Sequence, residues 1–233
     1  MKIDLFGDGI GAVEYISHMG SDLSVVNAAR VSFGSEKDAV DDKDVKLINY
    51  LMKHNHSSPF EHCALTFRFS VPIFIRSQHH RHRTWAYNEI SRRYTSVDIE
   101  FYEPKNFRQQ HKSNRQASTA DLKDPTLDSS YTDYGYEVAS AAVKKHHTRS
   151  LSLYNALMDS GVCREQARGV LPQNLYTQYY GTVNLHNLLK FVSLRIHEGA
   201  QWEIQQVAKA CLEIAKEMFP HSVESYMNIK AHK

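Results

Sequence analysis

The chain has 233 residues, a length that suits one domain better than two. Its 42% hydrophobic and 23% charged residues are ordinary for a globular protein, and they exclude a disordered tail, a collagen-like repeat and a coiled coil. The formal net charge of +2 is too small to indicate a nucleic-acid-binding protein, so any functional positive charge must be local.

The spacing of apolar residues predicts the secondary structure. Apolar and polar side chains alternate over residues 63–71, as in a half-buried strand, and Pro72 can open the helix that follows. Further strands are expected over residues 2–6 and 175–182. Helices are expected over residues 41–55, 136–158, 184–196 and 202–218. Polar residues dominate 103–130, which we expect to be an exposed loop inserted into a single domain of residues 1–233.

The cysteines and the lack of a long apolar run bear on location. Cys63, Cys163 and Cys211 are far apart and odd in number, which predicts reduced thiols in a cytoplasmic protein. No stretch approaches the ~18 apolar residues of a membrane span, and the acidic start of the chain is unlike a secretion signal. We therefore expect no membrane association.

Residues 7–12 fit the G-x-G-x-x-G/A pattern of dinucleotide-binding loops. Such a loop also needs a long helix that packs back on the preceding strand, and an acidic residue about 20 positions later. The region from Arg30 to Phe33 offers neither. We therefore interpret the pattern as an ordinary glycine turn.

Histidine is unusually frequent, with fourteen in the chain and six of them between His54 and His82. Imidazole is a common ligand of zinc, copper and iron, which raises the hypothesis of a metal-dependent hydrolase. However, the sequence has no HExxH motif, and the adjacent His79 and His80 cannot both face one ion from a regular helix. We expect no catalytic metal.

The segment 78–94 carries four arginines but only one acid, Glu89. Arginine offers a planar fork of donors that binds phosphate in a bidentate manner and keeps its charge. Together with tyrosine, asparagine and serine, these arginines suit an anionic ligand with a flat ring, such as a nucleotide or a flavin. An RNA-binding module that stacks bases on the aromatic residues remains an alternative.

The helix expected over 184–196 has two polar residues, Asn184 and Arg195, on the same stripe as Leu188 and Val192. His186 and Lys190 share the opposite face. A buried arginine needs a partner. This partner is either an acidic residue of the core or an oxygen of a ligand.

Arg81-His82-Arg83, followed by seven residues and then Ser91, resembles the signature of the flavin-dependent thymidylate synthases. Residues 56–62, 164–177 and 182–205 resemble further blocks of that family, in order and at compatible spacing. The resemblance implies an α+β fold with a mixed sheet packed with long helices, in a homotetramer whose active sites lie between subunits. It also implies the methylation of dUMP to dTMP. The carbon donor is 5,10-methylenetetrahydrofolate, released as tetrahydrofolate, and NADPH-reduced FAD is the hydride source.

The resemblance also implies a role for individual residues. The expected dUMP contacts are Gln78, His79, His80, Arg81, Glu89, Ile90, Ser91, Arg92, Arg93, Arg168 and Arg195. The expected FAD contacts are Ser58, Arg81, His82, Arg83, Glu89, Asn184, Leu185, His186 and Lys190. Arg195 is expected to be catalytic, because a fixed cation at the uracil edge can stabilise negative charge on the ring. His56 is expected to line the folate entrance.

Ser91 is expected to donate a hydrogen bond to the nucleotide rather than to attack it. A serine nucleophile needs a base, and the neighbouring arginines cannot accept a proton. The chain departs from the family at Gly199, where relatives often have histidine, at Lys190, and at Arg92, where a small residue is common. A viral source would place the enzyme in the host cytoplasm.

Overall fold

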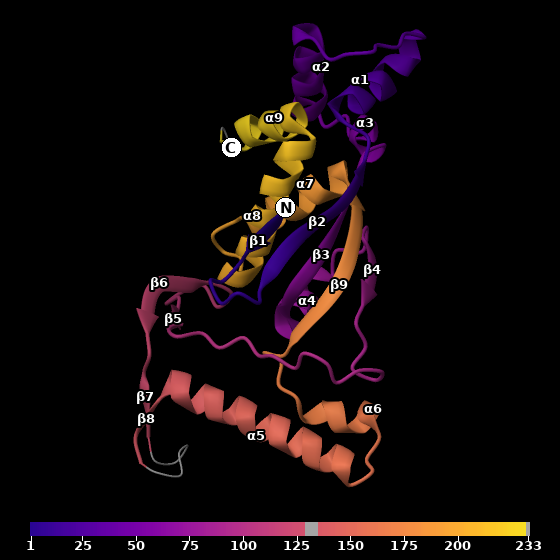
Figure 1. Cartoon of the computed structure of the whole chain (residues 1–233). Coiled ribbons are helices and arrows are strands. Elements are labelled where there is room, and N and C mark those ends of the chain that lie inside the picture. Colours follow the sequence, from indigo (N-terminus) through magenta and orange to yellow (C-terminus); the bar gives the residue numbers. More distant parts are fainter. Residues whose placement is uncertain (129–134, 232–233) are drawn as a thin grey trace.

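The computed structural model of the chain describes residues 1–128 and 135–231. Its centre is a five-stranded sheet in the order β1-β2-β3-β9-β4 (Figure 1). The strands are β1 (Lys2–Asp4), β2 (Ala12–Met19), β3 (Ala64–Pro72), β4 (Ala86–Glu89) and β9 (Tyr176–Asn184). The alternation predicted for β3 is confirmed, since Leu65, Phe67, Phe69 and Val71 are all fully buried.

The α+β class is confirmed, but the expected mixed sheet is wrong, because every described pairing in the sheet is antiparallel. The connection between β2 and β3 shows why. Met19, which ends β2, pairs with Ala64, which begins β3, so the intervening helices return the chain to the same end of the sheet. A parallel pair would need a crossover to the opposite end.

Helices gather at both ends of the sheet (Figure 1). At one end lie α1 (Asp22–Arg30), α2 (Asp42–Lys53) and α3 (Ser58–Glu61). At the other end lie α5 (Ala139–Asp159), α6 (Arg164–Ala167) and the short 3-10 helix η2 (Arg168–Val170). The core is completed by α4 (Ile73–His79), α7 (Leu185–Arg195), α8 (Trp202–Met218) and α9 (Pro220–Ala231). No helix of the described residues is long and apolar enough to cross a membrane.

The polar insertion expected as a loop over 103–130 is only partly a loop. β5 (Phe107–Gln110) and β6 (Ser118–Lys123) form a hairpin, and β7 (Thr126–Leu127) pairs with β8 (Glu137–Val138). Residues 129 and 130 lie outside the described part. The prediction missed the hairpin because its side chains are mostly exposed and polar, so no apolar alternation marks the strands.

The glycine turn over residues 7–12 is confirmed. Gly7 and Gly9 have φ angles of +71° and +76°, and the segment joins β1 to β2 without a helix. The carboxylate of Asp4 accepts from the backbone N–H groups of Phe6 and Gly9, and Asp8 accepts from Gly11. Because these donors already have partners, the turn does not offer them to a phosphate.

Candidate active site

One group of predicted residues surrounds a cavity of about 650 Å³ beyond the end of β4. Glu89 is the last residue of β4, the chain then follows the cavity through Ile90, Ser91 and Arg92, and Arg168 reaches it from η2. The cavity has the size of a small-molecule site. We call it the β4 cavity.

Glu89 is held in place by two neighbours in the β4 cavity. Its Oε1 accepts from Arg76 Nε at 3.0 Å and from the Thr177 hydroxyl at 2.7 Å. Arg76 also lines the cavity, and the sequence analysis missed it because it lies in an otherwise apolar stretch before the arginine-rich segment. The ion pair neutralises Glu89, so Arg168 is left as a cation for an anionic ligand.

Two of the four arginines of segment 78–94 have partners within the chain. Arg92 donates to the backbone carbonyls of Val97 and, at 2.9 Å, Asp98, so its guanidinium fixes the loop after β4. Burial lowers the pKa of Arg92. Arg93 lies 3.8 Å from a carboxylate oxygen of Glu165, in an exposed pair that contributes little to stability.

The Ser91 hydroxyl makes no hydrogen bond to a basic group among the residues that the structure describes. Within the described part of the chain, its one hydrogen bond comes from the backbone N–H of Arg93, at 3.3 Å. This environment supports the prediction of a hydrogen-bonding rather than a nucleophilic serine.

A second group of predicted residues forms around the ends of α4 and α7. Arg195, the last residue of α7, donates from Nε to His82 Nε2 at 3.1 Å. Within the described part of the chain its partner is therefore an imidazole and not an acid of the core. Burial and the charges of Arg195 and Lys190 lower the pKa of His82 to about 4, so the ring is neutral and accepts at neutral pH. Burial and the charge of Arg81 lower the pKa of Arg195 itself.

Arg81 and Arg83 are exposed beside this group, and neither side chain has an ion pair or hydrogen bond among the described residues. Gln78 differs, because its side-chain N–H group donates to the side-chain oxygen of Gln201. The second group thus contains two free guanidinium groups close to a partly buried one. Such a concentration of positive charge suits the phosphates of a nucleotide.

His79 and His80 lie deeper than the other predicted nucleotide contacts. The His79 ring is fully buried, its Nδ1 is 2.8 Å from the Tyr179 hydroxyl, and burial lowers its pKa well below the usual value. The His80 ring stacks on Tyr87 with 4.0 Å between centroids, and burial lowers its pKa as well. The His79 imidazole is therefore buried inside the protein and the His80 imidazole is half-buried, which separates both from the exposed arginines.

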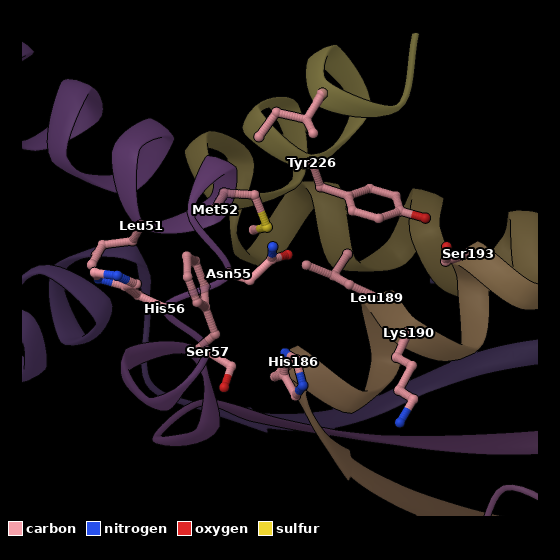
Figure 2. A pocket seen from close by; sticks show the side chains of 12 residues that line it. Leu51, Met52, Asn55, His56, Ser57, His186, Leu189, Lys190, Ser193 and Tyr226 are labelled. Carbon is pink, nitrogen blue, oxygen red and sulfur yellow. The ribbon is translucent and has the colours of Figure 1, made fainter. Parts of the chain in front are cut away.

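A third group lines a smaller pocket of about 220 Å³, where α2, α7 and α9 meet (Figure 2). His56, His186 and Lys190 lie on its edge, and Figure 2 shows Tyr226 reaching across from α9. Leu51, Met52, Phe60 and Leu189 make the interior apolar. An apolar pocket edged by a lysine and two histidines suits a flat ring that carries a phosphate.

The remaining predicted cofactor residues lie close to this α7 pocket. Ser58 is exposed at the start of α3, next to Ser57 of the pocket wall. Asn184 caps α7 by accepting from the Asn187 backbone N–H at 2.9 Å. Leu185 is fully buried, and its backbone N–H donates to the carbonyl of Cys63 at 2.8 Å. Its side chain and its backbone N–H are therefore both engaged within the protein.

Comparisons with known proteins agree on one family. A family model described as thymidylate synthase complementing protein matches residues 14–221. A flavin-dependent thymidylate synthase of Thermus thermophilus is 46% identical over 210 residues, which cover 90% of this chain and 73% of the relative. That of Thermotoga neapolitana is 42% identical over 228 residues, covering 97% and 94%. The crystal structure of the UMP/dUMP methylase PolB from Streptomyces cacaoi with 5-Br UMP is similar at a TM-score of 0.79, with 32% identity and 97% coverage of both chains.

Proposed function

This chain belongs to the thymidylate synthase complementing protein family, the flavin-dependent thymidylate synthases, and we infer that it methylates dUMP to dTMP. The family predicted from the Arg81-His82-Arg83 signature is thereby confirmed. As in the family, 5,10-methylenetetrahydrofolate donates the carbon and leaves as tetrahydrofolate, and NADPH reduces the FAD.

The observation that carries the proposal is the pairing pattern of the arginines. Arg76 already neutralises Glu89, whereas Arg168 in the same cavity has no carboxylate partner among the described residues and donates only to the backbone carbonyl of Glu165, at 3.4 Å. We assign the β4 cavity to the phosphate of dUMP, with Arg168 and the Ser91 hydroxyl as its donors. Arg93 can leave its weak pair with Glu165 to join them.

The residues present also fit FAD. Arg81, Arg83 and Lys190 are exposed cations that can bind its phosphates, and the apolar α7 pocket can take part of one ring. His186, Asn184 and the Ser58 hydroxyl lie close enough to that pocket to add hydrogen bonds. When bound, FAD supplies the hydride transfer that no side chain can perform.

Arg195 is the residue we assign to the reacting base. Because His82 occupies its Nε–H, the two terminal NH₂ groups of the guanidinium remain for the ligand. A cation fixed at the uracil edge stabilises the negative charge that develops on the ring, and partial burial strengthens this effect. Neutral His82 holds the guanidinium in position by accepting the hydrogen bond from Arg195 Nε.

We further propose a homotetramer with active sites between subunits. The three groups of residues line separate places in one chain, and the predicted dUMP contacts are divided between the β4 cavity and the Arg195 group. A neighbouring subunit that brings one group against another would complete the site. A single-domain subunit, a cytoplasmic location and the role of His56 at the folate entrance stay predictions.

A visible absorption spectrum of the purified protein tests the flavin part of the proposal. We expect a yellow protein with flavin bands, or a colourless protein that gains them when FAD is added and the excess is removed. A colourless protein that refuses FAD would contradict the proposal and favour the RNA-binding or metal-dependent alternatives.

A further inference from the structure

We propose that Glu203 is a positioning residue that fixes Gln78 so that its carbonyl oxygen faces the N3–H group of uracil. The inference deepens the proposed function and rests on it. Glu203 is the second residue of α8, only 4% exposed, and belongs to none of the three groups described above.

The Glu203 carboxylate is surrounded by donors from three parts of the chain. Arg108 of the β5–β6 hairpin places Nη2 at 2.6 and 2.7 Å from the two oxygens. The Tyr102 hydroxyl donates at 3.2 Å, and Gln201 Nε2 donates at 3.0 Å. The charge of Arg108 and these hydrogen bonds together compensate for the burial of the carboxylate.

The polarity of two amides follows from this arrangement. A carboxylate can only accept, so Gln201 must turn its NH₂ group toward Glu203 and its carbonyl oxygen away. That oxygen meets the Gln78 side chain, which must in turn direct its own NH₂ group at Gln201. The carbonyl oxygen of Gln78 is then left as an acceptor that has no partner among the described residues.

An acceptor at Gln78 distinguishes uracil from cytosine. Gln78 lies three residues before Arg81 and four before His82, the residue that holds Arg195. Uracil has an N–H donor at N3, whereas cytosine has a lone pair there, so an acceptor at this edge favours uracil. A reversed amide would present its NH₂ group at this edge and would favour cytosine, because two donors that face each other leave both without an acceptor.

The proposal also gives the polar insertion a function. Arg108 is the residue through which the hairpin reaches Glu203, and its guanidinium lies 5.3 Å from the ring centroid of Trp202. The hairpin therefore helps to hold the Glu203 carboxylate in place through the two contacts of Arg108.

The test measures Kd for dUMP and for dCMP on the FAD-bound enzyme, wild type against Glu203→Gln. A glutamine at position 203 can present either a donor or an acceptor to Gln201, so both amide polarities become accessible. The wild type should prefer dUMP, and the ratio of the two Kd values should fall at least about fivefold in the variant, which corresponds to about 1 kcal/mol. Tyr102→Phe is the matched control. It removes another hydrogen bond to Glu203, keeps the carboxylate, and should leave the ratio unchanged.

Gln201→Met is the second variant, because it interrupts the relay while the pair of Glu203 and Arg108 stays intact. Its preference for dUMP over dCMP should fall as it does in Glu203→Gln. This variant keeps the inference testable if Glu203→Gln fails to fold. An unchanged ratio in Gln201→Met, an equal loss in Tyr102→Phe, or a wild type without preference for dUMP would each overturn the inference. If the wild type makes dTMP and one of these results is obtained, only the inference is contradicted. If the wild type neither binds nor methylates dUMP, the proposed function is contradicted.

Discussion

Replacing Asp22 with alanine should loosen the C-terminal helix. Asp22 lies in α1, is 5% exposed, and its carboxylate accepts from the first turn of α9. The backbone N–H groups of His221 and Ser222 donate to it at 2.8 and 3.0 Å, and the Ser222 hydroxyl at 2.5 Å. A capping residue contributes about 0.5–2 kcal/mol, and a hydrogen bond to a charged group about 1.5–3 kcal/mol. Since the three bonds share one carboxylate, we expect Asp22→Ala to lower the free energy of unfolding by about 3 kcal/mol.

Urea denaturation followed by circular dichroism measures this loss, and amide hydrogen exchange shows where it occurs. Asp22→Asn is the matched control, because its one remaining oxygen can still accept from Ser222, and it should lose roughly half as much. Exchange should quicken in α9, whose Tyr226 lines the α7 pocket. An Asp22→Ala variant within about 0.5 kcal/mol of the wild type, or with unchanged exchange in α9, would refute the capping role.

Three further predictions concern the site. Arg195→Ala should reduce dTMP formation at least about 100-fold while flavin absorption is retained, and substantial residual activity would show that the uracil is misplaced. Arg81→Ala should weaken binding of FAD or dUMP in titrations, and unchanged Kd values for both would refute its role in binding phosphate. His79, His80 and His82 have lowered pKa values in the folded state, so the unfolded chain binds more protons below its usual histidine pKa. The free energy of unfolding should therefore fall as the pH drops from about 6.5 to about 4, whereas constant stability across that range would contradict this assignment.

The elements with clear periodicity were predictable from the sequence, and the others depended on distant partners. The buried alternation of β3 and the apolar stripes of α7 and α8 were predicted, because each carries its signal within one segment. β4 was missed, since the residues Ala86–Glu89 form a strand only by pairing with β9, about 90 positions later. The mixed sheet was an implication of the family resemblance, and the sequence could not correct it, because no local pattern states at which end of the sheet a connection returns.

The same distinction between local patterns and distant contacts applies to the site. The signature motif supplied most of the candidate residues, yet it could not show that Arg76 pairs with Glu89 or that His82 braces Arg195. Both contacts join side chains that only the fold brings together. No sequence pattern marked Glu203 as a site residue, because it is connected to Gln78 only through the side-chain amide of Gln201.

The most direct test of the proposed function is a dUMP methylation assay on protein stripped of flavin. The reaction contains 5,10-methylenetetrahydrofolate and NADPH, and it is run with and without added FAD. We predict that dTMP forms only when FAD is present and that tetrahydrofolate accumulates beside it. No dTMP with FAD present, or the same rate without it, would contradict the assignment.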